Sequence, residues 1–405
     1  MEKIKVIHLM HFSQSIKDKK YKHLMYYNFH HKTAFELNKY LDSEYYEIEC
    51  WRPEKSLKKT KSISINEIQH RLFPSSITPY YAKEISMPLI RALKREVKRF
   101  DGRVILHIHE YHSWHGLLIP LMFNKLILIG QHGGAVGPLR YLSRKWWATL
   151  FLPLLLAEYF MEKVALPKYD KLYSLNNYET NYLKTIVPTQ KISNQTMGVN
   201  FKIFTGVSKK SSRKHLKLKE NEFIILFIGR LVRNKGVFEL VKAFKKFHSK
   251  HKNSRLLIIG DGPYKDELET RTEGFPVEMP GWKDHDTEIK HYLAAADCYA
   301  HVSKSEGASV AIMEAMYMNL PIIATPAGNA PQVIKENKTG ILVRHDNIED
   351  IHNALLKIYK NPGKHNKESH KLAKEMFDWE SIAKKTIKDY ETLSKKYGFR
   401  DGGKK

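Results

Sequence analysis

The stretch FIGRLVRNKGVFELVKAF, residues 227–244, predicts the local fold of the chain. It reads as the end of a buried strand, a glycine turn at Gly229, and a helix that starts after Gly236. Arg230 and Lys235 lie between the two glycines, at the carboxyl end of the strand and beside a helix N-terminus. This arrangement favours a diphosphate site, and the alternative is an ordinary turn with surface cations. The stretch lacks the GxxxxGK[ST] pattern of a Walker loop.

The same strand-to-helix pattern recurs along the chain. IIGDGPYKDELE, residues 258–269, is a strand that runs into a glycine-rich turn and a helix, and it predicts a second wall at the same end of the sheet. Strand-like runs alternate with helix-length segments, which is typical of parallel sheets. The expected strands are IKVIHLM, YEIECW, VILHIHE, KLILIGQH and KLYSLN in the first half, and FIILFIG, RLLIIGDG, VEMPG, CYAHV and PIIAT in the second. We therefore expect an α/β protein with one doubly wound, Rossmann-like sheet in each half.

A chain of 405 residues is too long for one ordinary core, so two domains of roughly 200 residues each are expected. The Ser- and Lys-rich segment 206–222 has the composition of a linker. We expect a first domain over residues 1–205, a second over 206–380, and a C-terminal helix with a short tail over 381–405 that packs back toward the first domain. The two domains are expected to face each other across an enzyme-sized cleft.

SEGASVAIMEAM, residues 305–316, holds Glu306 and Glu314 with seven residues between them. A helix is expected to begin just after Glu306, so that backbone amides there could face a phosphate. The apolar neighbours of Glu314 predict that it is buried and partnered, and a carboxylate in a cleft suits the vicinal diol of a ribose or sugar ring. The alternative is an acid on a solvated helix face. The residues expected to lie at the helix start are Gly307, Ala308, Ser309 and Val310.

The net charge of +25 indicates an anionic partner or surface. Residues 51–100 hold 12 lysines and arginines against four acidic residues, a net charge of +8. Within them RALKREVKRF, residues 91–100, predicts a helix with Leu93, Val97 and Phe100 on one face and basic residues elsewhere. Nucleic acid and anionic lipid both remain possible partners, as does a basic face that serves only solubility.

The longest apolar stretch is WWATLFLPLLLAEYF, residues 146–160. It is too short to span a bilayer, Pro153 interrupts it, and Glu158 adds a charge. Trp146 and Trp147 behind a basic flank suit the headgroup region of a membrane, while a buried core helix is the alternative.

Cysteine usage and the N-terminus indicate an intracellular protein. Cys50 and Cys298 are far apart and show no CxxC or CxxH spacing, so neither a disulfide framework nor a structural zinc site is expected. MEKIKVIHLMHF, residues 1–12, has too short an apolar run for a signal peptide and alternates like a first strand.

Taken together, GRLVRNKG, IIGDGPYKDELE and SEGASVAIMEAMYMNLPIIAT resemble, in this order and spacing, the C-terminal domain of the retaining glycosyltransferases of family 4, which have the GT-B fold. The E-x7-E pair is the signature of that family. The resemblance covers roughly residues 197–345, beginning at MGVNFKIF (197–204). In the first half it rests mainly on HIHEYHSWHG (107–116) and GQHGG (130–134).

The resemblance implies a nucleotide-sugar donor in the second domain. Arg230 and Lys235, at the turn of Gly229, would bind the donor diphosphate; Glu306 would contact the transferred sugar or its phosphate side. Glu314 would hold the ribose hydroxyls. His132, in GQHGG, resembles the active-site histidine, which can hydrogen-bond a sugar hydroxyl and stabilise developing charge.

The resemblance further implies front-face transfer with retention and no cofactor or metal, because cations and helix amides act on the leaving diphosphate. Asp284 and Asp286, in the sequence DHD, resemble a metal-binding DxD motif, but they follow PGW in an expected loop. The acceptor is expected to be a glycan or a lipid-linked glycan. The basic and apolar segments of the first domain add an anionic membrane surface, and place the protein in the cytoplasm on the inner face of the cell membrane.

The chain departs from the family pattern at three places. Asn319 stands where glycine is common, which costs little because asparagine also suits a left-handed helix end. The loop after the first expected strand, HLMHFSQSIKDKKYKH (8–23), lacks the usual glycine pair, which affects the acceptor side. Ala308 and Ser309 replace an aromatic–glycine pair beside the donor sugar.

Two alternative functions remain open. One is a non-catalytic glycosyltransferase-like binding subunit; the other is a basic nucleic-acid-binding protein, for which no RNA-recognition, KH or zinc-finger signature is present, so no nucleic-acid partner is expected.

Overall fold

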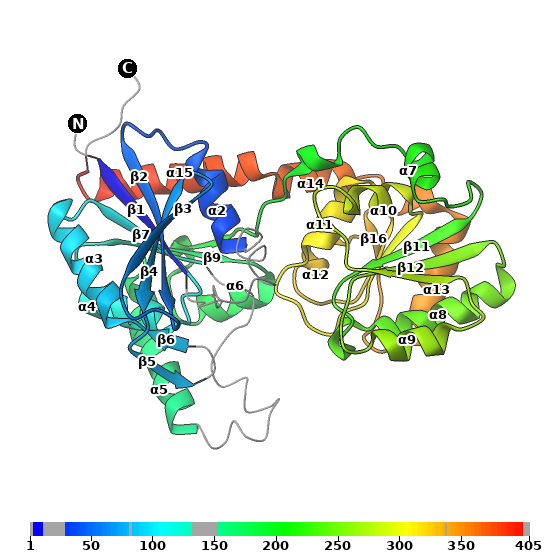
Figure 1. Cartoon of the computed structure of the whole chain (residues 1–405), viewed down its shortest axis with the longest axis horizontal. Coiled ribbons are helices and arrows are strands. Elements are labelled where there is room, and N and C mark those ends of the chain that lie inside the picture. The colour runs from blue at the N-terminus through cyan, green and yellow to red at the C-terminus, as the bar shows by residue number, and fades with distance from the viewer. Residues whose placement is uncertain (1–2, 11–28, 81–82, 132–151, 337, 400–405) are drawn as a thin grey trace. The chain divides into compact units, whose positions relative to one another are not determined.

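The chain folds into two α/β units. The computed structural model describes residues 3–10, 29–80, 83–131, 152–336 and 338–399. One compact unit contains residues 1–197 and 379–405, and the other contains residues 198–378. Each has a central, mainly parallel sheet with helices on both faces (Figure 1). This is the doubly wound architecture that the alternating sequence pattern predicts in each half.

The N-terminal unit is built on an eight-stranded sheet of order β10-β9-β8-β7-β1-β2-β4-β3. Every neighbouring pair is parallel except β3 and β4, which are antiparallel. The strand order reverses between β1 and β7, and all six residues of β1 are buried, as expected for a strand covered on both faces. The strands are β1 (Ile4–Leu9), β2 (Tyr46–Glu54), β3 (Lys61–Ile65), β4 (Ile68–Pro74), β7 (Val104–His109), β8 (Ile127–Gln131), β9 (Lys171–Ser174) and β10 (Ile192–Asn194).

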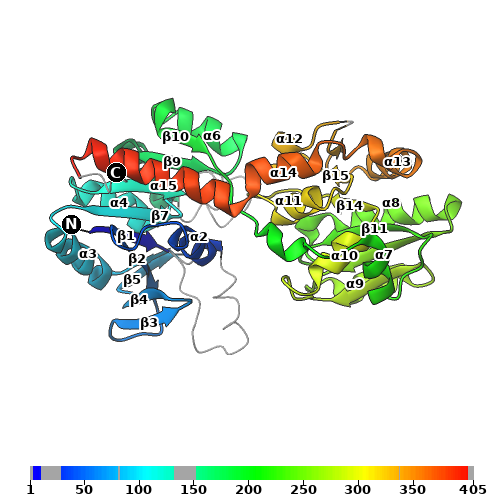
Figure 2. The same ribbon diagram turned by 90° about the horizontal axis from the view of Figure 1, so that it is seen from above.

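Helices cover both faces of this sheet. One face packs against α3 and α4, and the other against α2 and α15. Figure 2 shows α15, the C-terminal helix, beside α2, and the two helices are in contact. A separate hairpin is formed by β5 (Ile77–Tyr80) and β6 (Lys83–Ile85). The helices are α2 (Phe29–Asn38), α3 (Met87–Arg99), α4 (Trp114–Met122), α5 (Leu152–Ala165), α6 (Asn177–Lys184) and α15 (Trp379–Lys396).

The expected basic helix is confirmed as α3. Leu93 is buried, Val97 and Phe100 pack against the same core, and Arg91, Lys94 and Arg95 are exposed. The N-cap of α3 is Ser86, whose side chain accepts a hydrogen bond from the amide of Leu89 and closes the first turn.

The C-terminal unit is built on a six-stranded, all-parallel sheet of order β13-β12-β11-β14-β15-β16. The chain winds outward from β11 to β13, then returns to β14 beside β11 and winds outward the other way. The strands are β11 (Phe223–Ile228), β12 (Ser254–Ile259), β13 (Val277–Gly281), β14 (Cys298–His301), β15 (Ile322–Ala324) and β16 (Gly340–Leu342). The strand order therefore reverses between β11 and β14, where open α/β sheets bind their ligands.

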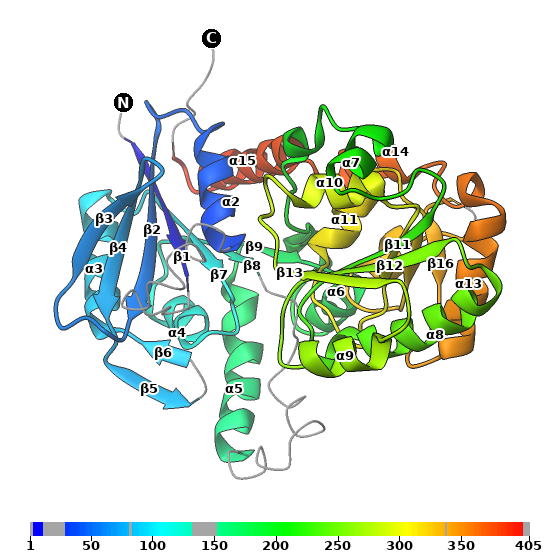
Figure 3. The ribbon, with the colours of Figure 1, turned by 45° about the vertical axis from the view of Figure 1, so that its right-hand side comes forward.

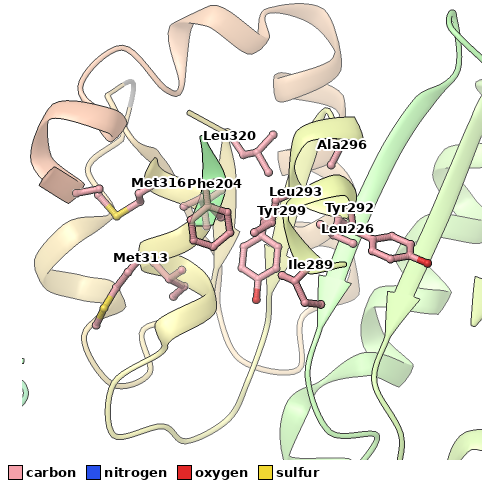
Figure 4. Packing of buried hydrophobic residues seen from close by; sticks show 14 of the residues in the cluster. Phe204, Leu226, Ile289, Tyr292, Leu293, Ala296, Tyr299, Met313, Met316 and Leu320 are labelled. Carbon is pink, nitrogen blue, oxygen red and sulfur yellow. The ribbon is translucent and has the colours of Figure 1, made fainter. Parts of the chain in front are cut away.

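Alternate residues of each strand feed two cores in this unit. Leu226 faces a core shared with α10, α11 and α14, shown in Figure 4, while Ile225 and Phe227 face a core shared with α8 and α13. The sheet is thus buried on both sides, and its central strands are held rigidly. The helices are α7 (Lys209–His215), α8 (Val237–Lys250), α9 (Lys265–Thr272), α10 (Ile289–Ala295), α11 (Val310–Tyr317), α12 (Ala330–Val333), α13 (Ile348–Lys360) and α14 (Ser369–Phe377).

The second unit starts earlier than residue 206, where the sequence predicts it. Phe201 and Phe204 already pack in its core, so the division falls after residue 197. The predicted linker 206–222 is wrong, because it contains α7 and belongs to the unit. Arg213 of α7 is buried and its guanidinium lies 2.7 Å from Asp297. The C-terminal helix starts at Trp379 rather than at 381, and belongs to the N-terminal unit.

Candidate functional site

Three loops of the C-terminal unit meet at the reversal of strand order. They follow β11, β12 and β14, whose carboxyl ends point the same way because the three strands are parallel neighbours. The first loop leads to α8, the second to α9, and the third to α11. Every residue that the sequence predicts for donor binding lies on the first or the third loop or in α11.

Close backbone contacts lock these loops together. Gly236 has φ of 68°, and a Cβ added there would lie 2.0 Å from the carbonyl oxygen of Val302. Gly260 has φ of 136°, and a Cβ added there would lie 2.0 Å from the carbonyl oxygen of Gly229. Asn234 strengthens the first contact, since its carbonyl accepts from the amide of Lys304 at 2.8 Å. Only glycine allows this approach, which places Lys235 against the loop after β14.

Lys235 and Glu306 form an ion pair across this contact. Their side chains are 19% and 13% exposed, so the pair is largely withdrawn from water. His301, the last residue of β14, adds its Nε2 atom 3.4 Å from Oε1 of Glu306. Burial raises the pKa of Glu306, but hydrogen bonding and positive charge from His301 and Lys235 outweigh it and lower the pKa to about 2. Glu306 is therefore a fixed carboxylate at neutral pH.

The other side of His301 is also held by polar contacts. Its Nδ1 atom lies 3.3 Å from the hydroxyl of Tyr299 and 3.4 Å from Oγ of Ser309. His301 and Tyr299 are buried, and Ser309 is the N-cap of α11, where its side chain accepts from the amide of Ile312. This network connects the end of β14 to the start of α11 and fixes the position of Glu306 between them.

The amides at the start of α11 are partly used by the protein itself. The N–H of Ser309 donates to Oδ1 of Asn329 at 3.0 Å, and Asn329 is fully buried. This amide is therefore not available to a phosphate, contrary to the sequence prediction. Gly307 and Ala308 are half-buried in the loop before it, and Val310 begins the helix.

Glu314 lies inside α11 and is 2% exposed. His285 places its Nε2 atom 2.5 Å from Oε1 of Glu314, and Asp286 Oδ1 lies 2.7 Å from the other ring nitrogen. The prediction that Glu314 is buried and partnered is confirmed. Its partner comes from the loop after β13, so Glu314 and this loop share one polar cluster.

Arg230 and Gly229 follow β11 directly. Gly229 is half-buried, and Arg230 is exposed. Among the residues that the structure describes, Arg230 has no ion-pair partner. It is thus a solvated cation at the strand end, unlike the paired Lys235.

Both carboxylates of the sequence DHD make local contacts. Oδ1 of Asp284 accepts from the amide and hydroxyl of Thr287, at 3.0 and 2.7 Å, so this carboxylate closes a turn. Asp286 is engaged by His285. Within residues 3–10, 29–80, 83–131, 152–336 and 338–399, no group of three or more His, Cys, Asp or Glu side chains is arranged to hold a metal ion.

His132, Trp146 and Trp147 lie outside the described residues. The strand before His132 is β8, whose last carbonyl, that of Gln131, accepts from the amide of Glu110 at 2.6 Å. Glu110 follows β7 with φ of 72°, which is unusual for a residue other than glycine. The predicted catalytic histidine therefore follows directly on a strand end that contacts the loop after β7.

Sequence reasoning missed His301, His285 and Asn329 as parts of the site. His301 lies in an expected strand, where a buried histidine resembles an ordinary core residue. In the sequence, His285 stands out only as the middle residue of a motif that resembles DxD. The only available signal was position, because each residue ends or follows a strand on the same edge of the sheet.

Residues 208–376 match the family described as "Glycosyl transferases group 1". The match lies within the C-terminal unit, and the matched range includes every predicted donor-site residue. The fold of the whole chain is similar to that of sucrose-phosphate synthase from Thermosynechococcus elongatus (TM-score 0.71, 20% identity, 98% of this chain and 100% of that one). It is also similar to Anabaena HepE solved with UDP (TM-score 0.70, 14% identity, 97% and 100%). The predicted GT-B fold with two Rossmann-like domains is confirmed.

Curated relatives match less than half of the chain. Alpha-monoglucosyldiacylglycerol synthase of Acholeplasma laidlawii is 27% identical over 209 residues, 46% of this chain and 52% of that protein. Sulfoquinovosyl transferase SQD2 of Arabidopsis thaliana is 33% identical over 130 residues, 31% and 24%. The teichuronic acid biosynthesis glycosyltransferase TuaC of Bacillus subtilis is 29% identical over 144 residues, 35% of each. The chain thus spans about half or less of the length of these relatives.

Proposed function

We propose that this protein is a retaining glycosyltransferase of family 4. It moves a sugar from a nucleotide-sugar donor to a glycan or lipid-linked acceptor, in the synthesis of a cell-surface polysaccharide or glycoconjugate. The observation that carries the proposal is the cluster of Lys235, Glu306 and His301 where the strand order reverses, within the group 1 glycosyltransferase domain.

The cations at this edge suit a leaving diphosphate. Lys235 is held in place by Glu306, so it meets the developing negative charge without first having to be ordered. Arg230 is exposed at the end of β11 and is free to turn toward the same anion. These two side chains supply the positive charge that a metal ion provides in other transferases, and the proposed reaction needs no metal.

The two glutamates hold the donor at different points. Glu306, with its pKa near 2, is unsuited to donate a proton at neutral pH, and it accepts hydrogen bonds from hydroxyls of the transferred sugar. Glu314 accepts hydrogen bonds from the ribose diol. When the donor binds, His285 either moves away from the carboxylate of Glu314 or shares it with the ribose.

The chemical step exchanges one bond at the anomeric carbon. The acceptor oxygen bonds to this carbon on the face from which the bond to the diphosphate oxygen breaks, and the acceptor proton passes to the leaving phosphate. Configuration is therefore retained. His132 of the N-terminal unit is proposed to hydrogen-bond a sugar hydroxyl near the reacting carbon.

Names of relatives support a uridine nucleotide and a lipid or polysaccharide acceptor. HepE was solved with UDP and with UDP-glucose. Two of the curated relatives described above have diacylglycerol or teichuronic acid in their names, and another match is a phosphatidylinositol N-acetylglucosaminyltransferase subunit of Saccharomyces cerevisiae. We propose accordingly that the protein works at the inner face of the cell membrane. Of the described helices, none is both long and apolar enough to cross a bilayer.

The test is nucleotide release. The protein is screened by thermal shift against a panel of nucleotide sugars, since a bound donor raises the melting temperature. The stabilising donor is then incubated with membrane lipid extract, and the freed nucleoside diphosphate is measured with and without EDTA. Release that survives EDTA supports the proposal. Release abolished by EDTA and restored by Mn²⁺ contradicts metal independence, and donor binding without release in any extract supports the non-catalytic binding subunit instead.

A further inference from the structure

Helix α5 has its polar and apolar faces reversed. A helix on a water-soluble domain normally buries its apolar stripe and exposes its charges. In α5, Glu158 and Glu162 are buried, at 1% and 2% exposure. The outward face is instead apolar, with side chains spaced four residues apart along one line. These residues, here named the α5 ridge, are Leu152 (37% exposed), Leu156 (38%), Phe160 (62%) and Val164 (57%).

Polar contacts hold α5 in this orientation. Oε2 of Glu162 accepts from the hydroxyl of Tyr182 at 2.5 Å, and Oε1 contacts Nδ1 of His112. Tyr182 belongs to α6 and His112 to the loop after β7, so Glu162 links three segments of the N-terminal unit. A rotation that buried the α5 ridge would break both contacts. The outward position of the ridge is therefore built into the packing of the helix.

The exposed face of α5 is also free of acid. Both of its glutamates are buried, and its one lysine, Lys163, is exposed beside Val164 with Nζ 4.7 Å from the centre of the Tyr159 ring. Lys168 is exposed just beyond the helix. The ridge is thus an apolar line with positive charge at one end, in a chain of net charge +25. Figure 3 shows α5 projecting beyond the ends of the strands of its unit.

The size of the ridge argues against a stable protein partner. Protein interfaces of ordinary size use about 20–30 residues a side, and the ridge offers four apolar side chains on a single helix. A bilayer needs no matching surface. Apolar side chains enter the boundary between headgroups and acyl chains, while lysines reach the lipid phosphates.

We propose that the α5 ridge seats the N-terminal unit in the surface of a bilayer that contains anionic lipid. The role of this membrane contact rests on the proposed function, because an enzyme reaches a lipid-linked acceptor at the membrane surface. Phe160 is the most exposed member of the ridge and is the main apolar anchor, and Lys163 contributes the part of the attraction that salt screens.

The test is flotation of the full chain with vesicles of phosphatidylcholine alone and of phosphatidylcholine with phosphatidylglycerol. Binding is expected to the mixed vesicles, weaker at high salt but still present. Phe160→Ser together with Val164→Ser should lower the partition coefficient by about tenfold or more, because two apolar side chains no longer enter the bilayer. The matched control is Tyr178→Ser, which removes an aromatic side chain that is 73% exposed on α6 of the same unit and should leave the partition unchanged.

A second variant, Phe160→Trp, reports position directly. Its added fluorescence, taken as the difference from the parent, should shift to the blue on vesicle binding and be quenched by brominated lipid. Loss of vesicle binding in the Tyr178→Ser control to the same degree, or an unquenched Phe160→Trp, overturns the inference. The inference is also overturned if a ridge variant changes the mass measured by sedimentation and leaves vesicle binding intact. That result would indicate that a second copy of the chain covers the ridge.

Nucleotide binding by the same preparations separates this inference from the proposed function. If UDP and other nucleoside diphosphates fail to bind while the ridge still governs vesicle partition, the proposed function is wrong and the membrane surface stands. If nucleotide binds and the ridge variants partition into vesicles like the parent, the membrane surface is wrong and the proposed function stands.

Discussion

Lys235 is held between the diphosphate site that we propose and the carboxylate of Glu306. Because its side chain is only 19% exposed and already ordered, its loss should affect the transition state more than the fold. We expect Lys235→Ala to lower kcat by about a hundredfold or more, while the loss of stability stays at about 1–3 kcal/mol because Glu306 keeps His301 as a partner. Lys242→Ala, an exposed lysine on α8, is the matched control and should keep full activity. A melting temperature that falls in step with activity would make Lys235 a structural residue.

Glu314 tests the ribose contact. Glu314→Gln keeps the shape of the side chain and removes its charge, so donor affinity should fall by about 1–3 kcal/mol. His285→Gln, which alters only the partner from the loop after β13, should change donor affinity less. Calorimetric titration with the donor measures both. Equal affinity of Glu314→Gln and the parent would remove Glu314 from the donor site.

The lowered pKa of Glu306 predicts that the difference in stability between the parent and Glu306→Gln depends on pH. Its folded-state pKa, about 2, lies below its ordinary value, so the ionised carboxylate stabilises the fold above about pH 4.5. This contribution is lost as the pH falls from 4.5 toward 2. Denaturant unfolding should show Glu306→Gln to be less stable than the parent by about 1–3 kcal/mol at pH 7, with the gap closing toward pH 3. A gap that is constant over this range would contradict the pairing with His301 and Lys235.

The sequence predicts the charged residues of the candidate site but not their partners. Lys235, Glu306 and Glu314 stand out because their spacing from glycines and from one another has a chemical meaning along the chain. His301 and His285 become visible only when β14 and the loop after β13 are placed beside α11. A single histidine in a strand or loop carries no such signal in the sequence.

At the level of elements, α7 shows how composition misleads. Its Ser- and Lys-rich sequence reads as a linker, yet Ser208 and Ser211 cap each other and Arg213 is buried against Asp297 and the carbonyl of Ala295. We expect Arg213→Ala to destabilise the protein by about 2–3 kcal/mol, since the largely buried carboxylate of Asp297 then keeps only the half-exposed Lys209 and the amide of Ile224 as partners. Lys214→Ala, an exposed neighbour in the same helix, should cost little. Urea unfolding that failed to separate the two variants would contradict the structural role of α7.

Helix α5 illustrates a different limit of sequence reasoning. The apolar run over residues 146–160 is evident in the sequence, and both a core helix and an interfacial segment fit it. The orientation of α5 depends on which of its side chains face inward, and Glu162 sets it by pairing with His112 and Tyr182. Those partners lie 50 and 20 residues away, so no local pattern reveals the reversed face.

For the whole molecule, the alternation of strands and helices predicts the fold class and most of the strands. The strands that the sequence did not predict are β3, β4, β10 and β16 and those of the β5–β6 hairpin, which are short or lie near the sheet edges. The second unit begins eight residues earlier than the sequence predicts, because Val199, Phe201 and Phe204 pack in its core. Edges and boundaries depend on tertiary packing, whereas the central strands are specified by their own apolar sequences.

Hydrogen exchange of the full chain, with and without UDP or the nucleoside diphosphate that the thermal-shift panel favours, tests whether a nucleotide binds at the carboxyl ends of β11 and β14. We expect slower exchange on binding in residues 229–236 and 302–314, at the carboxyl ends of β11 and β14, and little change in α7 and α13. Protection confined to residues outside the C-terminal unit, or no protection by any nucleoside diphosphate, would contradict it.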